Sequence, residues 1–248
     1  MLIKTSRSVS KHTALRIVHD LELSDKDCYT IYLPAKTPNL SKLLPQQEPC
    51  KSRVEQIMPH IENSETGGVL FLTQNKTIVI MPPFPMYNNI ITPGILSEPL
   101  RILFGMDTMV AVILIRLGRY AVAVLRGDDL ISTKTATRHV KNRHRAGGQS
   151  QKRFERSRER LIRELYDKTC QVARDVITPH IQELEYVLLG GERHTVNSFI
   201  KRCRFLQDLS NKTLPRRLAA GQPNQKSLKS INREVWSAQV MTFESCSS

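Results

Sequence analysis

The stretch Met109–Leu125 reads M-V-A-V-I-L-I-R-L-G-R-Y-A-V-A-V-L and decides the fold class of the second half of the chain. Two apolar, β-branched runs flank Leu117-Gly118-Arg119, a pattern that predicts a strand, a turn and a second strand. The first run, Met109–Ile115, is apolar at every position, so we expect it to be buried on both faces of a sheet. The arginines and the glycine between the runs make the stretch too short and too interrupted to span a bilayer.

Downstream of this strand pair, from Ser150 onward, the apolar period changes to that of a helix. The apolar positions follow one another at steps of seven, four, seven and four, which places them on one helical stripe. They are Phe154, Leu161, Leu165, Val172 and Val176. Pro179 ends the pattern, so the sequence predicts one long helix before it.

Further elements flank this helix. Ile131–His139 is expected to be a third strand, Tyr186–Leu189 a fourth, and Val196–Leu209 a second helix. Strands that alternate with helices predict an α/β layer domain over residues 96–248. Gly190-Gly191-Glu192 is interpreted as a tight strand-to-helix turn rather than a phosphate site, because no Walker lysine follows it.

Residues 1–95 are expected to form a reduced N-terminal α+β domain. Its predicted elements are a strand at Cys28–Leu33, a short helix at Ser52–Ile61 and a hairpin of Val69–Leu72 with Thr77–Met81. The prolines of 82–99 predict a connector between the two halves.

The charge balance is unusual for an otherwise ordinary composition. There are 37 Lys and Arg against 23 Asp and Glu, which gives a formal net charge of +14 and a pI near 9.8. Such an excess is typical of proteins with polyanionic partners, either nucleic acid or an acidic membrane surface, and composition alone leaves a generally basic soluble protein as an equal alternative. The N-terminal residues lack an apolar core, so no signal peptide is expected and the chain is placed in the cytoplasm.

The cysteines and histidines indicate no site of their own. The five cysteines are scattered without a Cys-x-x-Cys pair, and we interpret them as reduced cytosolic thiols rather than as a disulfide framework or a zinc site. The seven histidines form no metal-spaced set, so no metal and no cofactor are predicted. Trp236 is expected to pack, and the polar tail 242–248 to fray.

The densest cationic stretch is 134–163, and its placement is informative. Lys152, Arg153 and Arg156 lie in the first turns of the predicted helix, where the macrodipole disfavours each cation by roughly 0.3–1 kcal/mol. Cations at this end indicate an external anion, for which phosphates are the obvious candidate. The alternative is a solvated charged face.

At the centre of this stretch lies Ala146-Gly147-Gly148-Gln149-Ser150. The two glycines permit positive φ and let the backbone approach a crowded target closely. The glutamine has donors and an acceptor but no titratable proton, so it can orient water or stabilise an oxyanion without acting as a general base. Hydrolysis at this loop would therefore depend on positioning and preorganised hydrogen bonds.

The surrounding sequence, R-H-R-A-G-G-Q-S-Q-K-R-F-E-R over 143–156, resembles the catalytic loop of the archaeal and eukaryotic-type class-one peptide release factors. The resemblance extends to the strand pair Val110–Leu125 and to Tyr186–Gly191. It implies an RNase H-like release-factor middle domain, with a mixed sheet, helices and an exposed Gly-Gly-Gln loop leading into a long helix.

The same resemblance implies the site. Gly147 and Gly148 shape the loop, and Gln149 coordinates the water that attacks the peptidyl-tRNA ester. Neighbouring residues would hold ribosomal RNA or the tRNA acceptor end. They are Lys141, Arg143, His144, Arg145, Ser150, Lys152, Arg153, Arg156 and Arg160.

The implied partners are peptidyl-tRNA and the large ribosomal subunit at its peptidyl transferase centre, with neither membrane nor DNA. Stop-codon reading is not expected, because Pro49-Cys50-Lys51-Ser52 keeps only Lys-Ser of the family's Asn-Ile-Lys-Ser loop, and the third domain that docks a GTPase is not expected either. The chain looks most like the Vms-like hydrolases that free peptides from stalled ribosomes or split large subunits without reading a codon. Two alternatives are a nuclease that cuts the tRNA 3′ end and a non-catalytic ribosome-binding surveillance factor.

Overall fold

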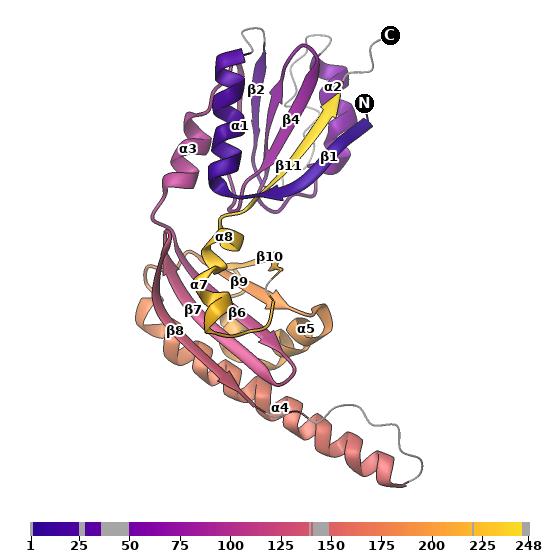
Figure 1. Cartoon of the computed structure of the whole chain (residues 1–248), viewed down its shortest axis with the longest axis vertical. Coiled ribbons are helices and arrows are strands. Elements are labelled where there is room, and N and C mark those ends of the chain that lie inside the picture. Colours follow the sequence, from indigo (N-terminus) through magenta and orange to yellow (C-terminus); the bar gives the residue numbers. More distant parts are fainter. Residues whose placement is uncertain are drawn as a thin grey trace. The chain divides into compact units, whose positions relative to one another are not determined.

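The computed structural model describes residues 2–24, 28–35, 50–138, 140, 149–219 and 221–244. The chain forms two compact units (Figure 1): unit 1 comprises Met1–Met106 with Trp236–Ser248, and unit 2 comprises Asp107–Val235. This division differs from the expected boundary at residue 95. Helix α3 (Glu98–Gly105) belongs to unit 1, and the C-terminal strand β11 (Ala238–Glu244) returns to the sheet of unit 1.

Unit 2 is built on a mixed five-stranded sheet in the order β10-β9-β6-β7-β8. Three consecutive strands run antiparallel to their neighbours, and β9 and β10 then add in parallel beside β6. This is the mixed sheet that the RNase H-like expectation requires. The strands are β6 (Met109–Arg116), β7 (Arg119–Arg126), β8 (Asp129–Thr137), β9 (Tyr186–Gly191) and β10 (Thr213–Leu218).

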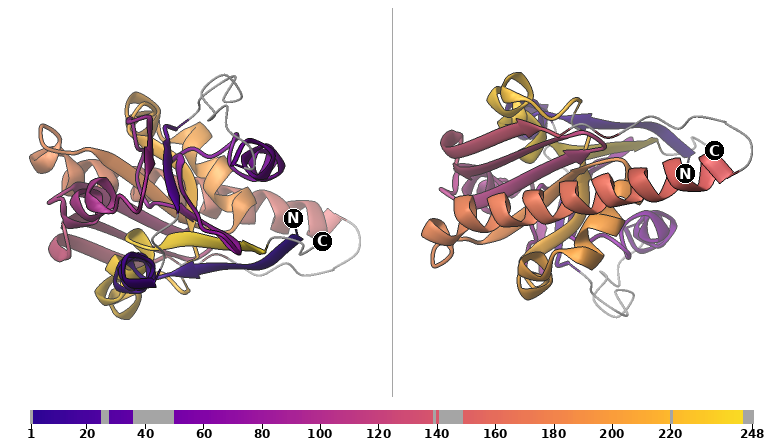
Figure 2. Two further views of the ribbon diagram at one scale, coloured as in Figure 1. Left: turned by 90° about the horizontal axis from the view of Figure 1, so that it is seen from above. Right: turned by 90° about the horizontal axis from the view of Figure 1, so that it is seen from below.

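The expected strand pair of unit 2 is confirmed. β6 and β7 pair from Met109↔Arg126 to Arg116↔Arg119, and Gly118 takes a positive φ of 92° in the turn between them. Met109–Ile115 is buried at every position. Helices cover this sheet: α4 (Gln149–Ile177) contacts β6, β7 and β8, and α7 (Gln225–Lys229) contacts β7 and β8. The right-hand view in Figure 2, seen from below, shows α4 running along the sheet.

The long helix of unit 2 is α4, which ends at Ile177 and continues as a 3-10 turn over Thr178–His180, where Pro179 lies. The second predicted helix differs from the expectation. It is divided into α5 (Arg193–Arg202) and α6 (Arg204–Asp208), because Cys203 between them has extended backbone angles. Two short helices, α7 and α8 (Ile231–Val235), complete the unit, and Asn224 with Ser227 forms a capping box at the start of α7.

Unit 1 contains an antiparallel six-stranded sheet in the order β1-β11-β4-β3-β2-β5. The predicted hairpin is confirmed as β3 and β4. The strands are β1 (Leu2–Val9), β2 (Tyr29–Leu33), β3 (Gly68–Leu72), β4 (Lys76–Met81), β5 (Ile90–Pro93) and β11, and the helices are α1 (Lys11–Ser24), α2 (Cys50–Ile57) and α3, with a 3-10 turn at Met58–His60.

Two expectations for unit 1 were wrong. The 82–99 connector contains strand β5 and the start of α3, and part of the expected frayed tail, 242–244, lies in β11. β11 is ordered because it pairs on both sides, with β1 and with β4. The packing role of Trp236 is confirmed, since it is 1% exposed and its ring meets that of Phe84 edge-on at 5.0 Å.

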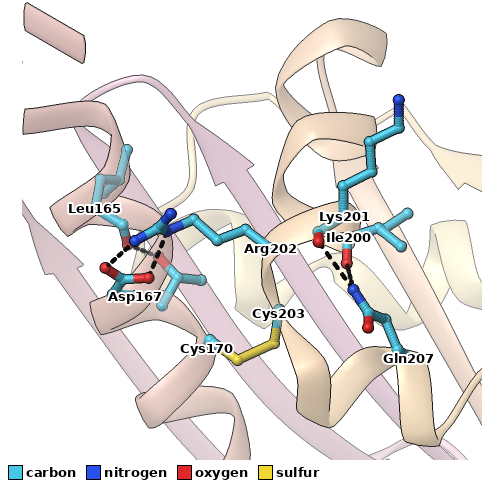
Figure 3. The surroundings of a disulfide bond; sticks show 9 residues. Leu165, Asp167, Cys170, Ile200, Lys201, Arg202, Cys203 and Gln207 are labelled. Carbon is cyan, nitrogen blue, oxygen red and sulfur yellow. Dashed lines mark hydrogen bonds and ion pairs between the residues drawn. A yellow bond between two sulfur atoms is a disulfide. The ribbon is translucent and has the colours of Figure 1, made fainter. Parts of the chain in front are cut away.

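The prediction of reduced cysteines was wrong for one pair. Cys170 and Cys203 form a disulfide, with their Cα atoms 5.4 Å apart and a sequence separation of 33 (Figure 3). The scattered spacing concealed this pair because only the fold brings α4 beside the end of α5. Cys28 is buried and lies outside this disulfide.

Candidate functional site

The predicted catalytic loop immediately precedes α4, which begins at Gln149. Gln149 and Ser150 are therefore the first two residues of a 29-residue helix. The other loop residues lie outside the residues that the structure describes; they are Lys141, Arg143, His144, Arg145, Gly147 and Gly148. The part of the predicted site that the structure does describe is thus the helix that carries the glutamine.

The first turns of α4 after Ser150 are exposed to solvent. All residues from 151 to 156 are exposed, and Figure 1 shows this end of the helix projecting beyond the strands of the sheet. The sequence maintains the helix there without tertiary packing, because it contains good helix formers and no glycine or proline. Gln151 also donates a hydrogen bond of 3.1 Å to Glu155 one turn later. We call residues 149–160 the exposed arm of α4.

Four cations in the first half of α4 share one face. Lys152, Arg156, Arg160 and Arg163 are exposed and follow at steps of four, four and three, the spacing of neighbours on a helix surface. Arg160 is 3.8 Å from Glu164, which also accepts a hydrogen bond of 3.1 Å from Arg138. Within the part of the chain that the structure describes, Lys152, Arg153 and Arg156 face no carboxylate in an ion pair.

The first turn of α4 contains no acidic residue. The positive end of the helix dipole and the unpartnered cations therefore add to one positive potential near Gln149, which favours an external polyanion such as an RNA backbone.

The expected apolar stripe of α4 begins later than Phe154, which is 47% exposed. The stripe becomes buried at Leu165 and continues through Val172 and Ile177, which pack into the core of unit 2. Phe154 lies outside this core because the arm extends past the sheet. It is therefore partly exposed at the same end of the helix as the cations.

The second half of α4 is held firmly in unit 2. The ring of Tyr166 lies 5.9 Å from that of Phe199 on α5, and burial raises the pKa of the Tyr166 hydroxyl. The hydroxyl of Thr169 donates to the carbonyl of Leu165 at 2.7 Å. The disulfide follows within one turn. The arm thus extends from a helix whose base is fixed by packing and a covalent bond.

A cleft of about 470 Å³ lies between α4 and α5, and the sequence did not indicate it. Its walls come from three separate segments: the β6–β7 turn, residues 158–166 of α4 and residues 192–198 at the start of α5. No contiguous motif marks it, so only the fold could reveal it. It contains Arg158, Tyr166 and His194 among its lining residues.

The interpretation of Gly190-Gly191-Glu192 as a strand-to-helix turn is confirmed. Gly191 ends β9 with a φ of +136°, and a Cβ there would lie 2.1 Å from the carbonyl oxygen of Ile115. Glu192 is the N-cap of α5. The glycines therefore allow close packing of β9 against β6 and its surroundings.

No group of three or more His, Cys, Asp or Glu side chains able to hold a metal ion occurs among the described residues. In the same described part of the chain, no helix combines the length and the apolar character that crossing a membrane requires.

Comparison with known proteins identifies relatives among translation factors. The chain is 31% identical over 127 residues to peptide chain release factor subunit 1 of Methanosphaera stadtmanae, covering 50% of this chain and 31% of the relative. It is 29% identical over 140 residues to the protein of the same name from Archaeoglobus fulgidus, covering 56% and 34% respectively. The chain thus spans about a third of the length of the curated relatives it matches.

Solved structures give weaker likenesses. An archaeal translation termination factor, aRF1, superposes with a TM-score of 0.40 at 15% identity, covering 92% of this chain and 72% of that one. The Vms1 mitochondrial localization core superposes with a TM-score of 0.44 at 12% identity, covering 83% and 95%.

The sequence match to a family is more extensive. The model of the Actinobacteria/chloroflexi VLRF1 release factor family matches residues 108–241, which is more than half of the chain and includes all strands of the unit 2 sheet, α4 and the Gly-Gly-Gln loop. The chain therefore belongs to the Actinobacteria/chloroflexi VLRF1 release factor family, within the class-one release factor-like superfamily.

Proposed function

We propose that this protein is a peptidyl-tRNA hydrolase that enters the peptidyl transferase centre of a stalled ribosome or split large subunit and releases the nascent chain without reading a codon. The observation that carries the proposal is the position of Gln149, which follows two glycines and begins a helix whose arm is exposed and cationic. Family membership supports a release-factor-like role. The proposal places the protein in the cytoplasm with ribosomes.

The chemistry follows from the residue types. The Gln149 side chain offers a carbonyl acceptor and an amide donor, so it can orient a water molecule toward the ester carbonyl but cannot take a proton from it. The proposed rate acceleration therefore comes from positioning the water, and the ribosome and the tRNA would provide the rest of the active site. Gly147 and Gly148 would let the backbone approach the ester without side-chain clashes.

The exposed arm would hold the loop in place. Lys152, Arg153 and Arg156 are exposed cations on the first turns after the loop, where they can contact RNA phosphates. Lys141, Arg143, His144 and Arg145 are proposed to add contacts on the other side of the glycines, and Ser150 and Arg160 to add contacts along the arm. The base of α4, packed in unit 2, would then fix the direction in which the arm points.

The test is peptide release from isolated large subunits that carry a labelled peptidyl-tRNA. Gln149→Ala and Gly148→Ala should bind the subunits like the unaltered protein but release peptide at least about 100-fold more slowly, the size of effect seen when a key transition-state donor is removed. Gln171→Ala is the matched control, because Gln171 is an exposed glutamine on the same helix, far from its start.

The released tRNA distinguishes the enzymatic alternatives. An intact CCA end supports ester hydrolysis, whereas a shortened end would show that the protein cuts the tRNA instead. If both loop variants release peptide as fast as the Gln171→Ala control, the Gly-Gly-Gln loop is not the working site. Binding without release by any form would favour a non-catalytic surveillance role.

A further inference from the structure

Outside the proposed catalytic loop, helices α4 and α5 are joined by a disulfide, an ion pair and an aromatic contact. Tyr166 contacts Phe199, Asp167 contacts Arg202 and Cys170 is bonded to Cys203, so the two helices run side by side in the same direction. The cleft between 158–166 and 192–198 lies toward their N-terminal ends. The disulfide therefore joins the two helices on the C-terminal side of this cleft, and Figure 3 shows its immediate surroundings.

The two sulfur-bearing residues differ in access. Cys203 is 0% exposed, whereas Cys170 is only partly buried and lies on α4 between exposed positions, including Asp167, Lys168 and Gln171. Thiol–disulfide exchange requires a thiolate to reach one of the two sulfur atoms. The burial pattern leaves Cys170 as the point of attack and Cys203 as the leaving thiol.

The backbone around Cys203 is held independently of the disulfide. The side-chain amide of Gln207 donates to the carbonyls of Ile200 and Lys201 at 3.1 and 2.9 Å, and the N–H of Cys203 donates to the carbonyl of Phe199 at 2.9 Å. Arg202 donates two hydrogen bonds to Asp167 next to the disulfide. These contacts can keep the two thiols close to one another after the bond is broken, which is the requirement for rapid reformation.

We propose that Cys170 and Cys203 are a reversible redox site, which a cellular dithiol reductant opens and a disulfide oxidant closes. In reduction, one thiolate of the dithiol bonds to the sulfur of Cys170, and Cys203 leaves as a thiolate and takes up a proton. The second thiol of the reductant then attacks the mixed disulfide and releases Cys170. Overall, two electrons and two protons pass to the protein, and the reductant leaves as a disulfide.

The physical consequence concerns the base of α4 and is independent of the proposed peptide release. In the oxidised form the α4–α5 pair is joined covalently, and the chain between Cys170 and Cys203, which are 33 positions apart, is closed into a loop. Reduction removes this constraint on the unfolded chain, but leaves the packing and the Asp167–Arg202 pair. Unit 2 should therefore remain folded in both states and differ in stability and in the freedom of α4 relative to α5.

The experiment uses the full chain equilibrated in buffers of reduced and oxidised dithiothreitol over a wide range of ratios. Free thiols are blocked with N-ethylmaleimide, and peptide mapping measures the Cys170–Cys203 cross-link while circular dichroism monitors the fold. We expect one reversible transition with the chain folded throughout, and a fall in Tm of unit 2 on the order of 5–10 °C upon reduction.

Variants assign the effect to this pair. Cys170→Ala should abolish the transition and give the Tm of the reduced protein in every buffer, and Cys203→Ser should do the same if it folds. Cys28→Ala is the control, because Cys28 is a buried cysteine of unit 1 outside this disulfide, and the redox transition of this variant should match that of the unaltered protein. Two results would overturn the proposal: both thiols blocked at every ratio, or a cross-link that is lost only when the protein unfolds.

Discussion

The guanidinium group of Arg202 donates two hydrogen bonds to the carboxylate of Asp167, from Nε to Oδ1 at 2.6 Å and from Nη2 to Oδ2 at 2.7 Å. Bidentate pairs of this kind between arginine and a carboxylate are among the strongest side-chain ion pairs. It joins α4 to the last residue of α5 next to the disulfide, and the hydrogen bond to Asp167 raises the pKa of Arg202. Both side chains are substantially exposed, at 41% and 55%, so solvent weakens the attraction.

Removal of this ion pair should therefore lower the free energy of unfolding by a small but measurable amount. In a double-mutant cycle with Arg202→Lys and Asp167→Asn, we expect a coupling of about 0.5–1 kcal/mol in the free energy of unfolding, since exposed pairs rarely exceed that range. Urea unfolding followed by circular dichroism measures it. The Arg160–Glu164 pair, a single contact at 3.8 Å, is the matched comparison and should couple more weakly. Equal coupling energies for the two pairs would show that the bidentate geometry adds no stability here.

A second prediction concerns the end of β9. Gly191→Ala should destabilise unit 2 by roughly 3 kcal/mol or more, because the residue combines a φ of +136° with a Cβ position only 2.1 Å from the carbonyl oxygen of Ile115. Gly118→Ala is the control: its φ is also positive, but the nearest atom lies 3.5 Å away, so a loss of about 1 kcal/mol is expected. Thermal unfolding of both variants measures the difference in stability. Equal losses of stability would show that the close approach of Gly191 to β6 does not exclude a side chain.

The sequence predicted those elements whose signals are local. Met109–Ile115 is apolar at every position, and this alone predicted the central strand of unit 2 and its burial on both faces. The helical period from Leu161 to Val176 predicted the packed half of α4 for the same reason. Phe154 matched that period but is exposed, because periodicity does not show where the sheet ends beneath a helix.

The sequence did not predict features that depend on distant segments. β11 is a strand of unit 1 because Met241 pairs with Val79 and Ser6, far away along the chain. The break of the predicted helix at Cys203 and its disulfide depend on Cys170, and the α4–α5 cleft depends on three segments. At the candidate site, local sequence predicted the positive charge of the arm, but only the structure showed that Gln149 begins the helix.

A third prediction concerns unit 1 in acid. The Glu22 carboxylate on α1 accepts a hydrogen bond from Ser97 and one of 2.7 Å from Arg101, and these partners hold its pKa below the ordinary value of 4.5, against the opposing effect of burial. A lowered pKa in the folded state stabilises the fold above the unfolded pKa, and this contribution is lost as the pH falls through the folded pKa. The destabilisation caused by Glu22→Gln should therefore be present at neutral pH and shrink progressively as the pH falls below the ordinary value of 4.5.

The fluorescence of Trp236 gives a selective measurement of this effect. Trp236 is the single tryptophan of the chain, lies in unit 1 and is 1% exposed, so its emission should change when unit 1 unfolds. Urea unfolding of Glu22→Gln and of the unaltered protein is compared at several pH values. A difference between the two that stays constant from neutral to acid pH would rule out the carboxylate as its source.

The last prediction tests the electrostatic part of the proposed function. Replacing Lys152, Arg153 and Arg156 together with glutamine should weaken binding to large ribosomal subunits at low salt and flatten its salt dependence. Each lost phosphate contact lowers the slope of log affinity against log salt by about 0.7–0.9, so the slope should fall by about 2–3. Lys168→Gln is the matched control, because Lys168 is an exposed cation on α4 that donates to Gln171, away from the arm. Because glutamine keeps helix propensity, a loss confined to the triple variant would identify charge on the arm, rather than the helix itself, as what the ribosome recognises. An unchanged slope would mean that these cations are a solvated face and that any binding depends on other residues.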